Sequence, residues 1–511
     1  MNLFAAIHVG SEQVSLKIVE YQTLDDIKTI EMASRQVALG EETFKTGRIS
    51  SAAVHETCEL LNGYRRMLQE YGVQHYRLVA TTAIREAENQ QYIVDQIRVK
   101  TGFTVEVADM PQEIFFKYVS LCKTVTRHGL TEDPKGLLFV DISSGGLGFT
   151  LLKDGEIRYQ QNIHIGALRI KESFDRQQRE SAYFHQALAE YIYSTIEPVK
   201  QALQHNNIRY LVLSGLETRL LLKMLNREQT ESLSFVSLSD FENLYNQVNA
   251  LNLPQLMQTF DLTESKAEIV LPTIVLYKQI LSLTTIEEIV IPHDHFMDGI
   301  TTLYVAEATA DPWLDVIDAQ VVSLAHALGR KYQYESEHAD SVEVFSLLLF
   351  DKLVRIHGLG KRARLLLKIA TILHDTGKFI NLRRHYFYSY RLIISSDILG
   401  FSETERATIA NIAYYHSKGI PNTNDTNFAV LTNDQQITVA KLAAILRLAD
   451  AIDRSHRHKA SVTDISLKAN ELIITVHSEE DISLEEWTFA DKADFFEDVY
   501  GVRAVLKRQV R

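Results

Sequence analysis

Several kinds of residue and segment are scarce in this chain of 511 residues. It has two cysteines, Cys58 and Cys122, which argues against a disulfide framework or a cysteine-rich zinc site and indicates a reducing compartment. Eight prolines and 22 glycines leave little sequence for disordered linkers. No apolar run reaches the ~18 residues that a bilayer-spanning helix needs, and the first residues have no basic, signal-like character. We therefore expect a cytoplasmic protein without a membrane partner.

The chain also lacks an excess of positive charge. It has 53 Lys and Arg against 66 Asp and Glu, which gives a formal net charge of −13. This balance argues against general attraction to nucleic acid, so no specific nucleic-acid partner is expected. A polyanionic substrate would need local basic patches, and such patches occur at residues 361–364, 383–385, 454–459 and 506–511.

Short turns rich in glycine and serine follow predicted strands at three places. The strands are expected at residues 4–9, 136–141 and 207–213, and the second of them ends in Asp141. Glycine lets backbone N–H groups approach an anion, and a neighbouring carboxylate can hold a metal. At the first two places a plain β-turn is the alternative, and at the third it is a plain strand-to-helix turn. The candidate phosphate-binding residues are Gly10, Ser11, Ser144, Gly145, Gly146, Ser214 and Gly215.

Four segments occur in an order and spacing that resemble the exopolyphosphatase/guanosine pentaphosphate phosphatase (Ppx/GppA) family. These are residues 6–11, 80–89, 140–146 and 165–169. The resemblance implies an actin-like (ribonuclease H-like) α/β fold of two duplicated domains, followed by an all-α, HD-type helical domain and a small C-terminal α/β segment. The expected boundaries are residues 1–125, 126–310, 311–460 and 461–511. The resemblance also assigns catalytic roles to Glu113, Asp141 and Arg85, with Arg85 contacting phosphate.

The chain departs from the family's pattern at several of these positions. The first loop has His8 where the family has Asp, and Gly148 stands where the second loop has Glu. Ser143 and Ser144 replace two glycines, and a Cβ hinders close backbone approach to an anion. Because metal-binding carboxylates are lost, we expect the actin-like site to be weakened, or to bind phosphates without efficient turnover.

A second set of polar residues lies in the region of expected helices. His374 and Asp375 are adjacent after an apolar helical run, and other histidines and an aspartate precede and follow them. In this order they resemble the ligands of the HD phosphohydrolase superfamily, and Lys378 is a candidate phosphate contact. Imidazole and carboxylate suit a divalent metal, with Mg²⁺ or Mn²⁺ expected and Fe or Zn as alternatives in the helical site. The expected metal ligands are His338, His374, Asp375, His385, His416 and Asp450.

Three functions remain open at this point. The first is phosphoanhydride hydrolysis, with release of phosphate from polyphosphate or from guanosine pentaphosphate. The second is a metal-dependent HD phosphohydrolase that acts on a nucleotide or a phosphate ester. The third is a regulator that binds polyphosphate or an alarmone without catalysis. Polyphosphate or a phosphorylated nucleotide is thus the expected partner, and we expect a homodimer.

Overall fold

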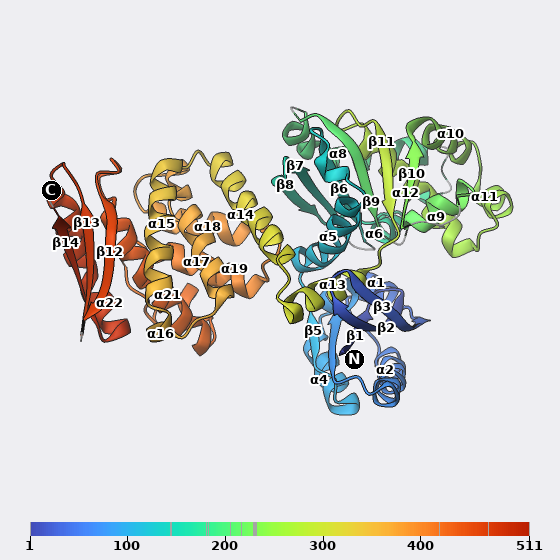
Figure 1. Cartoon of the computed structure of the whole chain (residues 1–511). Helices are drawn as coiled ribbons and strands as arrows, with labels where there is room; N and C mark the ends of the chain where they lie inside the picture. Colours follow the sequence, from blue (N-terminus) through green and yellow to red (C-terminus); the bar gives the residue numbers. More distant parts are fainter. Residues whose placement is uncertain are drawn as a thin grey trace. The chain divides into compact units, whose positions relative to one another are not determined.

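The computed structural model describes residues 2–143, 146–179, 181, 183–204, 206–215, 217–227, 232–417, 419–468 and 470–509. The chain forms two compact units, Met1–Gln320 and Val321–Arg511. The first unit contains two β-sheets with helices around them (Figure 1). Its N-terminal sheet has the strand order β3-β2-β1-β4-β5. These strands are β1 (Asn2–Val9), β2 (Gln13–Thr23), β3 (Asp26–Gln36), β4 (His75–Ala80) and β5 (Val105–Val107).

The second sheet of this unit has the order β10-β11-β9-β6-β7-β8. Its central strand β6 is apolar except for Asp141, and each of its residues is buried. Such a strand has no solvent face, as expected of the middle of a sheet that is covered on both sides. The strands are β6 (Gly136–Ile142), β7 (Leu147–Lys153), β8 (Glu156–Ile163), β9 (Ile208–Ser214), β10 (Leu233–Ser237) and β11 (Glu288–Pro292).

The two sheets share one connection pattern. In each, three consecutive strands pair antiparallel (β1, β2 and β3; β6, β7 and β8). A later strand (β4 or β9) then pairs parallel with the first of the three, and one more strand (β5 or β11) pairs parallel with that one. The fold is therefore duplicated, although no repeat is visible in the sequence. Within each sheet the parallel strands run in the same direction, so the turns that follow them lie at one edge of that sheet. The turns after β1, β6 and β9 line one cavity.

Helices cover the sheets of the first unit. One of them, α13 (Phe296–Thr309), follows the second sheet in sequence but packs against β1, β2 and α5, where Met297 and Ile300 join Phe4 and Phe116 in one core. A Cβ on Gly299 would lie 1.7 Å from the carbonyl oxygen of Phe116, so this helix contact depends on glycine. The helices are α1 (Leu39–Thr46), α2 (Ser51–Tyr71), α3 (Thr82–Arg85), α4 (Gln90–Thr101), α5 (Met110–Arg127), η1 (Leu130–Glu132), α6 (Ala167–Glu172), α7 (Arg176–Arg179), α8 (Phe184–Leu203), α9 (Glu217–Met224), α10 (Leu238–Asn249), α11 (Leu253–Phe260), α12 (Glu264–Leu281) and α13.

The second unit is a helical bundle with a small sheet at its C-terminal end (Figure 1). The sheet has the order β12-β13-β14, and α22 connects the parallel strands β13 and β14 and packs on α21. The elements after α14 (Trp313–Lys331) are α15 (Ser336–Lys352), α16 (Val354–His357), α17 (Lys361–Leu373), η2 (Thr376–Phe379), α18 (His385–Ser395), α19 (Glu403–Tyr414), α20 (Thr426–Ala429), α21 (Asn433–Ile452), β12 (Ser461–Lys468), β13 (Glu471–His477), α22 (Ser483–Tyr500) and β14 (Arg503–Gln509).

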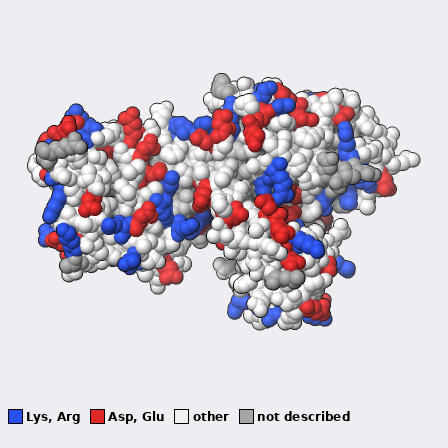
Figure 2. Space-filling model, viewed as in Figure 1, with Lys and Arg blue, Asp and Glu red and all other residues white. Residues whose placement is uncertain are grey.

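Acidic and basic side chains are interspersed on the face seen in Figure 2. Among the described helices, none combines the length and the apolar character that crossing a membrane requires.

Candidate functional site

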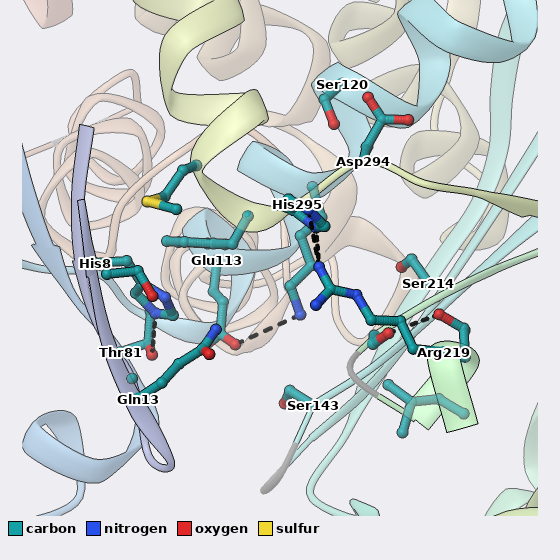
Figure 3. A pocket seen from close by; sticks show the side chains of 18 of the residues that line it. His8, Gln13, Thr81, Glu113, Ser120, Ser143, Ser214, Arg219, Asp294 and His295 are labelled. Carbon is teal, nitrogen blue, oxygen red and sulfur yellow. Dashed lines mark hydrogen bonds and ion pairs between the residues drawn. The ribbon is translucent and has the colours of Figure 1, made fainter. Parts of the chain in front are cut away.

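A cavity of about 260 Å³ lies in the first unit and is lined by residues of both sheets and their connections. Glu113 enters it from the first turn of α5, and Arg219 enters from α9 (Figure 3). The helix α5 begins at a capping box made by Asp109 and Gln112, which fixes the first turn and therefore the position of Glu113.

Glu113 is a buried carboxylate held by two cations. Its Oε2 accepts a hydrogen bond from Nη1 of Arg85 at 3.0 Å, and Nζ of Lys117 lies 3.9 Å from its Oε1. Burial by itself would raise the pKa of Glu113, but the charges of Arg85 and Lys117 outweigh burial and lower it. Glu113 is therefore ionised at neutral pH.

Asp141 lies at the end of β6 and also pairs with Lys117. Nζ of Lys117 is 2.9 Å from Oδ2 of Asp141, and Oγ of Ser214 donates to Oδ1 at 2.6 Å. Burial opposes the charge of Lys117, but Asp141 and Glu113 raise its pKa above the ordinary value, so the ammonium stays charged. Asp141 and Arg85 are not among the described residues that line the cavity.

Four of the predicted phosphate-binding residues line the cavity: Gly10, Ser11, Ser214 and Gly215. Gly215 has φ +129°, and a Cβ there would lie 2.2 Å from the carbonyl oxygen of Ile142, so only glycine fits this turn. Gly146 is described but is not among the lining residues, while Ser144 and Gly145 lie outside the described residues.

Positions 8 and 148, at which the chain departs from the family pattern, make other contacts. Nε2 of His8 is 3.0 Å from Oγ1 of Thr81, and burial lowers the pKa of His8 to about 4, so the ring is neutral. At position 148 a Cβ would lie 2.6 Å from Cδ1 of Ile114, so this isoleucine fills the space that a longer side chain would need.

Three charged residues of this site were not predicted from the sequence. Lys117 lies one helical turn after Glu113, an i,i+4 spacing that is a local signal, but its contact with Asp141 spans 24 residues. Arg219 and Glu217 follow the predicted Ser214-Gly215 turn on α9, and Nη2 of Arg219 contacts the ring of His295 at 2.6 Å. Oε2 of Glu217 is buried without a hydrogen-bond partner among the described residues.

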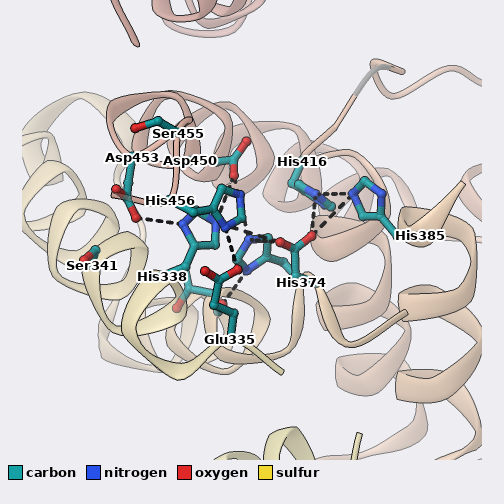
Figure 4. Close-up of polar contacts among 12 residues, drawn as sticks. Glu335, His338, Ser341, His374, His385, His416, Asp450, Asp453, Ser455 and His456 are labelled. Atoms are coloured by element: carbon teal, nitrogen blue, oxygen red, sulfur yellow. Dashed lines mark hydrogen bonds and ion pairs between the residues drawn. The ribbon is translucent and has the colours of Figure 1, made fainter. Parts of the chain in front are cut away.

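The second unit holds a separate cluster. The structure brings together the six side chains that were predicted as metal ligands, and Figure 4 shows five of them by label. The six residues are His338 of α15, His374 and Asp375 after α17, His385 of α18, His416 after α19 and Asp450 of α21.

Asp375 lies at the centre of this cluster. Its Oδ2 is 3.6 Å from Nε2 of His374, and its Oδ1 is 3.4 Å from Nε2 of His385 and 3.5 Å from Nε2 of His416. On the other side, Nε2 of His338 is 3.4 Å from Oδ1 of Asp450. The carboxylate of Asp375 thus lies between His338, His374 and Asp450 on one side and His385 and His416 on the other.

The four imidazoles are all oriented by their Nδ1 atoms. Nδ1 of His338 faces Oδ2 of Asp453 at 2.8 Å, and the other three Nδ1 atoms face backbone carbonyl oxygens. Each carbonyl can only accept, so Nδ1 carries the proton in these three rings and Nε2 has its lone pair toward the cluster. Nε2 of His338 and of His374 and Oδ1 of Asp375 have no hydrogen-bond partner among the described residues. Buried imidazole nitrogens and a carboxylate oxygen left in this way fit a divalent cation.

The cluster favours positive charge at His338 but not at His374. Burial by itself would lower the pKa of His338, but Asp450 and Asp453 raise it to about 9, whereas burial lowers the pKa of His374 to about 3. Lys378, predicted as a phosphate contact, has its Nζ 2.5 Å from Oδ2 of Asp375. Arg447 is buried and donates to the carbonyl oxygens of residues 415 and 417, which fixes the segment that carries His416.

Two family models match consecutive parts of the chain. The model of the Ppx/GppA phosphatase family matches residues 17–299, more than half of the chain, and that of Ppx/GppA phosphatase, domain III, matches residues 323–491. The chain belongs to the Ppx/GppA phosphatase family. Guanosine-5'-triphosphate,3'-diphosphate pyrophosphatase of Aeromonas hydrophila is 22% identical over 477 residues, which cover 93% of this chain and 92% of that protein. The protein of the same name from Vibrio vulnificus is 21% identical and covers 91% and 90%.

Solved Ppx/GppA structures share the fold. An exopolyphosphatase from Cytophaga hutchinsonii has a TM-score of 0.53 and 21% identity, covering 60% of this chain and 98% of that one. The Aquifex aeolicus Ppx/GppA family member has a TM-score of 0.51 and 19% identity, covering 60% and 98%. The predicted Ppx/GppA membership and the actin-like, duplicated α/β fold are therefore confirmed.

Proposed function

We propose that this Ppx/GppA phosphatase hydrolyses phosphoanhydride bonds in the cavity of its first unit, with a linear polyphosphate or a guanosine pentaphosphate as substrate. The observation that carries the proposal is the ionised Glu113 on the cavity wall, between fixed cations and glycine-containing turns. The relatives that match over most of the chain are named as pyrophosphatases, and a structural neighbour is named as an exopolyphosphatase.

The roles follow from position. Glu113 would accept a hydrogen bond from the attacking water and aim it at the terminal phosphorus. Because the transition state of phosphoryl transfer is loose, orienting the water matters more than removing its proton, and a carboxylate of lowered pKa is adequate. Lys117 and Arg219 would attract the phosphate oxygens, and the backbone at Gly10 and Gly215 would allow close approach. Arg85 would hold Glu113 in its ionised orientation.

The helical cluster supports a second candidate, an HD-type metal phosphohydrolase. We propose that His338, His374, Asp375 and Asp450 would hold one divalent cation, and that Asp375, His385 and His416 would hold a second. A cation bound there would supply a water of lowered pKa and would polarise a phosphate oxygen. This chain's own contribution is the alignment of the Nε2 atoms and the cation Lys378 beside Asp375, and its substrate would be a nucleotide or a phosphate ester.

A phosphate-release screen tests the two sites. Polyphosphate, guanosine pentaphosphate and nucleotides would be assayed with Mg²⁺, with Mn²⁺ and with EDTA. If the cavity is the working site, Glu113→Gln should lower kcat about 10²–10⁴-fold while Asp375→Asn retains it. The exposed Glu132→Gln is the matched control. Loss of activity in Asp375→Asn alone would move the reaction to the helical cluster. Binding of polyphosphate without phosphate release in any condition would contradict both candidates and favour a regulator.

A further inference from the structure

One residue of the cavity, Lys117, stands where a family member would be expected to hold a divalent cation. Its ammonium is 2.9 Å from Asp141 and 3.9 Å from Glu113, so it bridges the two acidic residues that the family pattern assigns to metal binding and catalysis. The side chain of Lys117 is only 14% exposed, and both acidic partners are 7% exposed, so this is an interior ion pair.

Three of the carboxylate oxygens that could bind a metal already have hydrogen-bond partners. Both carboxylate oxygens of Asp141 are occupied, one by Lys117 and the other by the hydroxyl of Ser214 at 2.6 Å. Oε2 of Glu113 accepts from Arg85. A divalent cation such as Mg²⁺ prefers carboxylate oxygens and water in a near-octahedral shell, and here the carboxylate oxygens face ammonium, guanidinium and hydroxyl groups.

The other two acidic positions of the family pattern cannot compensate. Position 8 is a neutral histidine that contacts Thr81, and the space next to Gly148 is filled by Ile114. Glu113 and Asp141 each pair with a built-in cation, Arg85 and Lys117, and these two pairs balance in charge without a metal. Burial raises the pKa of a third carboxyl group, Glu217, to about 7, so it carries only part of a charge at neutral pH. The residues of the cavity do not fit the divalent cation that the family implies.

We infer that Lys117 replaces the divalent cation in this cavity, so that the site binds a phosphate chain without metal. The ammonium of Lys117 and the guanidinium of Arg219 both line the cavity and supply the positive charge that a phosphate chain requires. The ligand class rests on the proposed function, whereas the replacement of the metal rests on the geometry of Lys117 alone. The helical cluster would remain the metal-binding part of the chain.

The affinity of the full chain for inorganic tripolyphosphate, measured by calorimetry in the presence of EDTA, tests whether the site binds a phosphate chain without metal. Wild type should bind, and Lys117→Met should bind at least tenfold more weakly. The control is Lys45→Met, which alters another i,i+4 lysine–glutamate pair, with Glu41, on the exposed surface and should bind as wild type does. Undetectable wild-type binding in EDTA, or equal binding by Lys117→Met, would overturn metal-free binding.

A count of bound Mn²⁺ by electron paramagnetic resonance tests the replacement itself, without any phosphate. Removing the ammonium leaves two buried carboxylates that can attract a cation, so Lys117→Met should bind one more Mn²⁺ per chain than wild type and Lys45→Met. An equal count in all three proteins would overturn the inference. Because this readout involves no hydrolysis, it stands even if the proposed activity is not found.

Lys117→Met leaves buried charge unpaired and can fail to fold, so a second variant is needed. The double variant Lys117→Met/Asp141→Asn removes the pair as a whole. Its affinity for tripolyphosphate in EDTA should fall at least tenfold, and it should bind no additional Mn²⁺. Wild-type affinity in this double variant would overturn the role of Lys117 just as directly.

Discussion

Nδ1 of His338 lies 2.8 Å from Oδ2 of Asp453, and both side chains are almost completely buried. The other oxygen of Asp453 accepts the backbone N–H of His458 at 2.8 Å, so the carboxylate is fixed from two directions. The ring of His456 stacks on His338 with centroids 3.7 Å apart. Asp453 therefore orients His338 toward the cluster although it does not itself belong to the six predicted ligands.

Asp453→Asn should weaken metal binding by the helical cluster. A carboxylate behind a ligating histidine fixes its orientation and raises its basicity, and its loss costs about 10–100-fold in metal affinity. Competition between the protein and a chelator for Mn²⁺ would measure the change. The exposed Asp464→Asn in the same unit is the control and should behave as wild type. Unchanged affinity in Asp453→Asn would rule out this orienting role.

Removal of metal should destabilise the second unit. A ligand that binds only the folded state contributes about 2.7 kcal/mol at a concentration 100 times its Kd, so added EDTA should lower the thermal midpoint of this unit. Differential scanning calorimetry with Mn²⁺ and with EDTA would measure the shift. His374→Gln should remove most of the difference between the two conditions. A midpoint that is the same with Mn²⁺ and with EDTA in wild type would speak against a metal at the cluster.

Much of the architecture was predictable because its signals are local. The actin-like fold was predicted from short motifs in a recognisable order, and the six side chains predicted as metal ligands, from His338 to Asp450, do lie close together. The ion pair of Lys117 with Asp141 was not predictable, because it joins helix α5 to strand β6 across 24 residues. Strand β10 likewise pairs with β11, which lies more than 50 residues later in the chain. Pairing across such distances leaves no periodic trace in the sequence.

Glu217 should make the first unit less stable as pH rises. Burial raises the pKa of Glu217 to about 7 from an ordinary value of 4.5. Because the folded-state pKa is the higher one, the stabilisation is complete below about pH 4.5 and is lost as pH rises through about 7. Glu217→Gln does not titrate, so its stability relative to wild type should increase between pH 5 and pH 8, by up to about 3 kcal/mol.

Calorimetry of wild type and Glu217→Gln at these two pH values would measure that difference. The exposed Glu264→Gln of α12 should follow wild type at both. If wild type and Glu217→Gln lose stability in parallel between pH 5 and pH 8, the carboxyl group of Glu217 is already ionised in the folded protein.

Two glycine substitutions should have opposite effects on the first unit. Gly215→Ala forces a side chain into φ +129° and against the carbonyl oxygen of Ile142, 2.2 Å from the new Cβ. Such backbone strain costs about 1–3 kcal/mol before the clash is counted. Gly63 lies inside helix α2, and a Cβ there would meet no described atom within 4 Å. Gly63→Ala should therefore stabilise the unit by about 1 kcal/mol.

The thermal midpoints and tripolyphosphate binding of the two variants would separate fold from function. Gly215→Ala should lower the midpoint and weaken binding, because the turn after β9 lines the cavity. Gly63→Ala should raise the midpoint and leave binding unchanged, since α2 contributes no residue to the described lining of the cavity. If Gly215→Ala keeps the wild-type midpoint and affinity, the turn at Gly215 does not have the close approach to Ile142 that makes glycine necessary there.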